Sequence, residues 1–180
     1  MEKKNQEINE IYIAYGKFAI EYEQLCFSIN ICITKLLEKD GLKDTRLSGI
    51  LLSDQTAYPL ITKLKTIIAV VFETNPDIVK HLNPLFNFCL DIIEKRNKII
   101  HGTWFVGIGK NNSTDFSVAY GSKVKAKPNK GLDIDFMEYN PTHFETLTES
   151  IIKAKLNFAE LTGILMFEQD LSKIKNIKIN

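Results

Sequence analysis

The feature that most constrains the fold of this chain is a long apolar stripe near its N-terminus. Apolar residues return at steps of three and four, the spacing that places side chains on one face of an α-helix. The pattern lasts about four heptads and stops at Asp40-Gly41, where a glycine can end a helix. It predicts one helix over residues 5–39, with a face wide enough to pack against several others. The stripe comprises Ile8, Ile11, Tyr15, Phe18, Tyr22, Leu25, Ile29, Cys32 and Leu36.

A second helical pattern covers residues 56–73, after a stretch from 43 to 54 with the composition of a turn. Asn75-Pro76 ends this pattern, since a proline suits the first turn of a new helix but cannot continue an old one. Asn83-Pro84 repeats the start signal. A third helix is therefore predicted from Pro84 to His101, where the following glycine can take the left-handed conformation that ends a helix.

After this third helix the apolar period changes from helical to alternating. The alternation predicts two or three short antiparallel strands, as an insert at about residues 103–139. A last helix is predicted from Asn140-Pro141 to about Lys173, followed by a frayed tail, "SKIKNIKIN". The alternating residues are "TWFVGIG", then Phe116, Val118 and Tyr120, then Leu132, Ile134 and Phe136.

These patterns predict a mainly α-helical chain, an up-and-down helical bundle with a small antiparallel β insert before the last long helix. The 180 residues are 44% hydrophobic, which suits a single domain over residues 1–180. No signal-peptide core and no bilayer-length apolar run is visible, so a soluble, cytoplasmic protein without membrane contact is expected. The net charge of +1 excludes a globally basic nucleic-acid binder but allows a local basic patch.

The three cysteines, Cys26, Cys32 and Cys89, lie within apolar patterns. Their spacing fits neither a disulfide framework nor a zinc site, so they are predicted to be reduced core thiols. No metal and no cofactor is expected. Two histidines, His81 and His143, lack a recognisable ligand or catalytic spacing and are interpreted as surface or capping residues.

The end of the third predicted helix, "EKRNKIIHGTW", interrupts the apolar pattern with polar side chains. Arg96 falls on the apolar line, where it needs a counter-charge, while Asn97 and His101 lie four apart on the neighbouring face with Glu94. Cations complement the helix dipole at this end. Lysine would serve the dipole equally, and only two of the 23 basic residues are arginine. The planar fork of Arg96 favours a phosphate or carboxylate ligand.

The stretch "RNKIIHG", from Arg96 to Gly102, resembles the RxxxxH signature of the HEPN superfamily. Its members are small helical-bundle proteins, many of them metal-independent endoribonucleases and some of them toxins or phage-defence effectors. The context is similar too, with long helices before the motif and a further helix after it. The resemblance implies catalytic roles for Arg96, Asn97 and His101, RNA as substrate, a homodimer that brings two motifs together, and an antitoxin or regulatory partner. Position 103 is threonine, whereas toxins silenced by a minimal nucleotidyltransferase resemble RxxxxHxY.

The chemistry of these side chains fits RNA cleavage independently of the resemblance. RNA carries its own nucleophile, the 2′-hydroxyl, so cleavage needs a base, in-line geometry and positive charge beside the phosphate. His101 can exchange a proton near neutral pH as base or as acid. Arg96 would hold the phosphate, and Asn97 would orient the histidine or a phosphate oxygen. Glu94 is a weaker candidate, as orienter of the histidine or as partner of Arg96.

A second group of candidates lies in "SKVKAKPNKG". Lysines at every second residue share one face of an extended chain and are candidate RNA-backbone contacts, although a solvated hairpin edge explains them at least as well. These lysines are Lys123, Lys125 and Lys127, with Lys130 in the turn.

Two alternatives to an enzyme stay open. In a non-catalytic nucleotide- or RNA-binding module, or a helical dimerisation module, the motif residues would bind a phosphate or build a polar contact between copies. In a purely structural helical protein, Arg96 would be buried against an internal carboxylate. Trp104, beside the helix end, is interpreted as a core residue.

Overall fold

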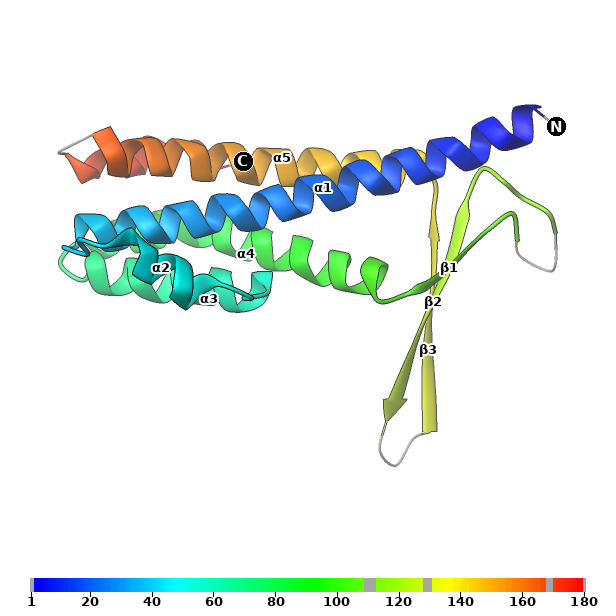
Figure 1. Cartoon of the computed structure of the whole chain (residues 1–180), viewed down its shortest axis with the longest axis horizontal. Coiled ribbons are helices and arrows are strands. Elements are labelled where there is room, and N and C mark those ends of the chain that lie inside the picture. The colour runs from blue at the N-terminus through cyan, green and yellow to red at the C-terminus, as the bar shows by residue number, and fades with distance from the viewer. Residues whose placement is uncertain (1, 109–112, 128–130, 168–169, 180) are drawn as a thin grey trace. The chain divides into compact units, whose positions relative to one another are not determined.

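The computed structural model describes residues 2–108, 113–127, 131–167 and 170–179; the side chains of Lys125 and Lys127 are outside this description. The chain is mainly α-helical, with a small antiparallel sheet before the last long helix, which confirms the predicted fold class (Figure 1). It divides into two compact units. The motif unit comprises the chain up to Glu21 together with Glu94–Glu149, and the bundle unit comprises Tyr22–Ile93 and the chain from Ser150 onward.

Helix α1, Glu2–Lys39, confirms the first predicted helix. The turn that ends it contains Gly41, whose φ of 109° lies in the left-handed region that favours glycine. The predicted stripe is the buried face: Phe18, Ile29 and Leu36 have no exposed surface. Over the residues that the structure describes, none of the helices has both the length and the apolar character of a membrane span.

The stretch predicted to be a turn instead contains helix α2, Thr45–Leu52. Its N-cap is Asp44, whose carboxylate accepts a hydrogen bond from the backbone N–H of Arg46 at 3.0 Å. The helix buries only Ser48 and Leu52 and turns its other apolar side chains to the surface. The prediction was wrong because a short helix with an exposed apolar side lacks the usual amphipathic pattern. Helix α3, Ala57–Val71, follows as predicted.

Helix α4, Pro76–Ile100, begins eight residues before the predicted start at Pro84 and runs through that proline. An internal proline costs a helix about 3 kcal/mol. The ring of Pro84 is exposed, while its neighbours Leu82 and Leu85 are fully buried. Burial on both sides of the proline therefore offsets the lost hydrogen bond, a tertiary effect that local sequence signals do not contain.

Helix α5, Pro141–Phe167, starts where predicted but ends before Lys173. The tail is not frayed, because Leu171–Asn176 form a 3-10 helix and Ile174 and Ile177 are almost fully buried. The ring Nε2 of His81 lies 2.9 Å from the carbonyl oxygen of Ile177. His81 is thus a tertiary contact for the tail, neither a surface nor a capping residue. These residues all belong to the bundle unit.

The sheet has the order β1-β2-β3 and is antiparallel throughout, with strands β1 Thr103–Val106, β2 Ala119–Lys127 and β3 Gly131–Tyr139. The predicted insert of about 103–139 agrees with these bounds. Phe116 and Val118, predicted within a strand, precede β2 instead. The ammonium of Lys4 lies over the ring of Phe116, 4.1 Å from its centroid, so a contact with α1 positions this residue.

The core of the motif unit is an aromatic cluster around Phe144, which is 1% exposed. Its ring centroid lies 5.3 Å from that of Tyr139, 5.7 Å from Tyr15 and 6.2 Å from Trp104. His143 caps the start of α5 as interpreted from the sequence: its backbone N–H donates to the Asn140 side chain, and its ring Nδ1 accepts from the Asn140 backbone N–H.

We expect Phe144→Ala to lower the free energy of unfolding by about 3 to 5 kcal/mol, because it removes the ring that the other aromatic residues surround. Phe167→Ala is the matched control, since Phe167 is 80% exposed and should change stability by less than about 0.5 kcal/mol. Urea unfolding followed by circular dichroism measures both. Equal effects would contradict this view of the core.

The cysteines are free thiols, as predicted. Burial raises the pKa of Cys32 to about 12 and that of Cys89 to about 12. Only the thiolate reacts, so at pH 7 to 8 both should resist a thiol reagent in the native protein. We expect one fast-reacting group, the half-buried Cys26, and the other two only after unfolding. A Cys26→Ala variant should show no fast phase, and a native protein with three fast thiols would contradict the prediction.

Candidate functional site at the end of α4

The sequence motif occupies the last turn of α4 and the turn that follows it, within the motif unit. Ile99 is fully buried and anchors this turn, whereas Arg96 and Asn97 are half-buried and His101 is exposed. Arg96 therefore lies on the edge of the buried face, consistent with its place on the apolar line. The polar groups of the motif are accessible from one helix end.

Arg96 and Asn97 are brought together. The Nη1 of Arg96 donates a hydrogen bond to the side-chain oxygen of Asn97 over 3.3 Å, a long bond for this pair of groups. The guanidinium and the carboxamide both carry N–H donors, which are the groups that bind anions. Arg96 and Asn97 thus form a ready pair of hydrogen-bonding groups for an anion.

Glu94 is paired with Lys98. The Nζ of Lys98 lies 2.9 Å from Oε1 of Glu94, and their side chains are 44% and 68% exposed. This hydrogen bond, then the charge of Glu94, and less strongly Asp135 and Tyr139, raise the pKa of Lys98. A pair so exposed contributes little to stability. The contact places Glu94 beside Lys98, whereas the sequence pattern also allowed a role for it toward His101 or Arg96.

Two side chains of the sheet hold the last turn of α4. The indole Nε1 of Trp104 donates to the carbonyl oxygen of Ile99 at 2.6 Å, and the Nζ of Lys123 donates to the carbonyl oxygen of Asn97 at 3.1 Å. The final carbonyls of a helix have no partner within the helix, and these bonds supply donors from the sheet. The carbonyl oxygen of Ile99 also accepts from the backbone N–H of Gly102 at 3.2 Å. A Cβ at Gly121 would lie 2.9 Å from the Trp104 ring, so glycine is required for the indole to approach.

Sequence reasoning missed the roles of Trp104 and Lys123 toward the helix end. Trp104 was interpreted as core, and it does pack on Phe144, but its N–H has the additional task described above. This second role depends on the pairing of β1 with β2, which places Trp104 opposite Gly121 and is not visible in the local sequence. Lys125 and Lys127 lie in β2, but their side chains, like Lys130 as a whole, are outside the described residues.

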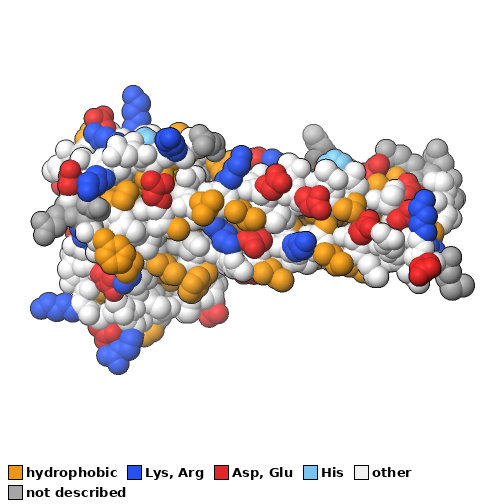
Figure 2. Space-filling view, turned by 90° about the horizontal axis from the view of Figure 1, so that it is seen from above, with side chains coloured by type: hydrophobic (Ala, Val, Ile, Leu, Met, Phe, Trp, Pro, Cys, Tyr) orange, Lys and Arg blue, Asp and Glu red, His pale blue; other side chains and the backbone are white. Residues whose placement is uncertain are grey.

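Both signs of charge occur beside the motif, since Glu94 and Lys98 form an ion pair on the same helix turn. On the face that Figure 2 shows, acidic and basic side chains are interspersed with exposed hydrophobic ones. Within the described ranges, no group of three or more histidine, cysteine, aspartate or glutamate side chains is placed to hold a metal ion. The motif is therefore best described as a guanidinium, an amide and an imidazole at one helix end.

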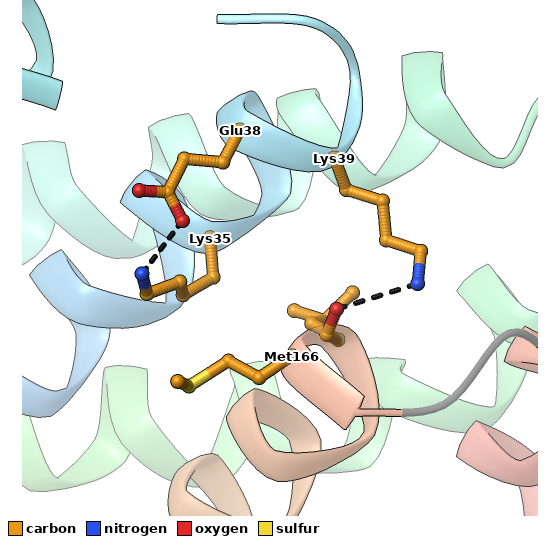
Figure 3. Close-up of a pocket in the computed structure, with 5 residues that line it drawn as sticks. Lys35, Glu38, Lys39 and Met166 are labelled. Atoms are coloured by element: carbon orange, nitrogen blue, oxygen red, sulfur yellow. Dashed lines mark hydrogen bonds and ion pairs between the residues drawn. The ribbon is translucent and has the colours of Figure 1, made fainter. Parts of the chain in front are cut away.

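Two hollows lie elsewhere. One, of about 340 Å³ in the bundle unit, is lined by Lys35, Glu38, Lys39, Leu165 and Met166 (Figure 3). Its lysines are engaged, because Lys35 pairs with Glu38 at 2.6 Å and Lys39 donates to the carbonyl oxygen of Leu165 at 3.3 Å. The other, of about 380 Å³ in the motif unit, contains two glutamates of α1, which disfavour a phosphate. Its lining is Glu7, Glu10, Ser117, Val118, Asn140, Pro141 and Thr142.

Comparison with known proteins gives no further guide to the site. No family model matches the chain, and no curated protein or solved structure matches it either.

We expect Lys123→Met to lower the free energy of unfolding by about 1 to 2 kcal/mol, because the Asn97 carbonyl loses a charged donor while the apolar stem is kept. Lys175→Met is the matched control: its ammonium makes an exposed contact, 3.3 Å from Asp77, and should matter by less than about 1 kcal/mol. Chemical denaturation compares them. A Lys123 variant as stable as the wild type would show that the sheet does not hold the helix end.

Proposed function

We propose that this protein is a metal-independent endoribonuclease of HEPN type, acting as a toxin or phage-defence effector, and that two copies form its active site. The observation that supports it is the arrangement at the end of α4. The guanidinium of Arg96 lies beside Asn97, and an accessible imidazole, His101, follows within two turns of the chain. An anion grip and a proton-transfer group in one short segment are the two requirements of RNA cleavage by the 2′-hydroxyl.

Helix geometry favours a site shared between two copies. Arg96 lies within α4 and His101 one residue beyond its end. Helical spacing continued over these five residues would separate the two side chains by about 140° around the helix axis. One helix end therefore directs the two side chains to different sides. A two-fold axis beside α4 would place His101 of one copy near Arg96 of the other, twice. The dimer proposed here thus supplies a base or acid and a phosphate grip to each scissile bond.

The chemical steps follow from these groups. An imidazole removes the proton of the 2′-hydroxyl, the oxygen attacks the adjacent phosphorus in line, and the 5′-oxygen leaves after it receives a proton. Arg96 stabilises the negative charge that grows on the non-bridging oxygens. Asn97 orients the guanidinium through the bond already present. Whether His101 acts as base, as acid, or as both in the two copies is left open by its position.

Beyond the motif, the lysines of β2 are the proposed contacts for the RNA. The sequence alternation predicts that Lys123, Lys125 and Lys127 share one face of an extended strand. In the proposal they are contacts for the RNA backbone. Lys123 has a structural task at the Asn97 carbonyl, so its removal would weaken both binding and fold.

We expect purified protein to cut RNA in excess EDTA and to leave a 2′,3′-cyclic phosphate and a 5′-hydroxyl, since the nucleophile belongs to the substrate. An oligonucleotide with deoxyribose at the scissile position should resist. His101→Ala should reduce the single-turnover rate about 100-fold or more, and Arg96→Lys similarly, because an ammonium lacks the planar fork.

Lys98→Met is the control, since it removes a charge from the same helix turn without touching Arg96, Asn97 or His101. It should cleave like the wild type. A 3′-hydroxyl product, full activity of Arg96→Lys, or a requirement for a divalent ion would contradict the mechanism. Tight binding of RNA without any cleavage would favour the non-catalytic binding module.

A further inference from the structure

The inner face of the sheet is apolar near the core, where it carries Val106, Ala119, Met137 and Tyr139. Toward the turn between β2 and β3, the two faces have the opposite character to that expected. The inner face, which carries Trp104 and Lys123 toward α4, also carries Asp133 and Asp135, and these residues are not exposed. The outer face is mainly apolar around Phe136, Ile134 and Leu132. An antiparallel sheet normally packs its apolar face on the core and leaves the polar face in water. The outer face comprises Thr103, Phe105, Tyr120, Ser122, Val124, Ala126, Leu132, Ile134, Phe136 and, at its edge, Glu138, by the register of the strands.

The outer face exposes enough apolar surface to form an interface with another protein. Phe136 is 81% exposed, Leu132 71% and Val124 57%, and Phe105 and Ile134 are close to half exposed. These five side chains expose on the order of 500 Å² of apolar surface, which equals the largest patch on an ordinary monomer. A stable interface buries about 800 Å² on each partner. The apolar patch with a rim of Thr103, Tyr120 and Ser122 approaches that size.

The shape of the outer face is self-complementary. At each of three successive cross-strand pairs, the side chain on β3 is larger than its neighbour on β2: Phe136 beside Ser122, Ile134 beside Val124, and Leu132 beside Ala126. The face therefore has a ridge along β3 and a shallow groove along β2. Consider a two-fold axis that runs parallel to these strands, between the two sheets. The rotation keeps each residue at the same height along the strands, but it places β3 of one copy over β2 of the other. It lays the ridge of each copy into the groove of the other, with the sheets about 10 Å apart.

Other modes of contact fit less well. None of the described outer-face side chains is a lysine or arginine, so the face offers no charge for RNA phosphates or anionic headgroups. Pairing of two β3 edges is disfavoured, because a two-fold antiparallel register brings the aspartates of the two copies opposite or close to one another. Face-to-face contact avoids this, since Asp133 and Asp135 point to the inner side.

We propose that the outer face of the sheet binds the outer face of a second copy of this chain, with β3 of each copy over β2 of the other. This contact differs from the one that would join two motifs, because Trp104 and Lys123 reach α4 from the inner face. The two contacts have different two-fold axes. Together they join four copies when the axes are perpendicular and intersect.

The first test introduces a charge on the ridge. We expect Phe136→Glu to weaken the contact at least tenfold and to halve the mass measured by light scattering at about 10 μM, the working range of a standard-size interface. Leu51→Glu is the matched control, since Leu51 is an apolar side chain of α2, 65% exposed, and its variant should keep the wild-type mass. An unchanged mass of the Phe136 variant, or a monomeric wild type, would overturn the proposal.

The second test concerns the two-fold arrangement itself. Ser122→Lys should also weaken self-association, because it fills the groove with a charge. Mixed in equal amounts, the Ser122→Lys and Phe136→Glu proteins should form a mixed pair and restore the paired mass. In this pair the introduced carboxylate of one copy faces the introduced ammonium of the other. At the second, symmetry-related contact, Phe136 and Ser122 are both unchanged. If each variant alone is dissociated and the mixture does not restore the paired mass, the arrangement with β3 of each copy over β2 of the other is ruled out.

RNA cleavage separates this inference from the proposed function. Phe136→Glu lies away from the motif and should keep the cleavage rate of the wild type if the motif contact persists. Loss of paired mass in a protein with no nuclease activity still supports the sheet contact. An active nuclease whose mass ignores the Phe136 substitution retains the proposed function and overturns the sheet contact.

Discussion

The end of α4 depends on hydrogen bonds from the sheet. The last carbonyls of any helix lack partners within the helix, and here the Trp104 indole and the Lys123 ammonium supply two of them. These bonds tie the helix terminus to two different strands. They therefore fix the position of the sheet relative to Arg96 and Asn97, and the motif unit is organised around this terminus. Gly121 belongs to the same constraint, because any side chain there would collide with the indole.

This constraint explains the unusual polarity of the sheet. The face of the sheet that donates hydrogen bonds to the end of α4 needs polar groups. Lys123 is one of them, and Asp135 is its cross-strand neighbour on the same face. Alternation along each strand then places apolar side chains outward. The exposed Phe136 and Leu132 are thus a geometric consequence of the inner contacts. Burying them in an assembly removes their cost in water, which is the physical argument for a partner on that side.

The elements that could be predicted from the sequence are those whose pattern is long and local. α1 shows its buried stripe over its whole length, and the alternation of β3 gives both faces of the strand. α2 was missed because its apolar side chains face outward, and the passage of α4 through Pro84 was missed because burial of flanking leucines outweighs a local break signal. The docked tail depends on His81, a contact 96 residues away in sequence.

The candidate site could also be predicted only where its features are local in the sequence. Helical spacing predicted Arg96 on the apolar line and grouped Asn97 with His101 and Glu94 on the neighbouring face. The hydrogen bond between Arg96 and Asn97 joins adjacent residues, and helical spacing does not indicate it. The pairing of Glu94 with Lys98 is a one-turn contact that the same spacing allows, so it competes with any role of that carboxylate toward the motif.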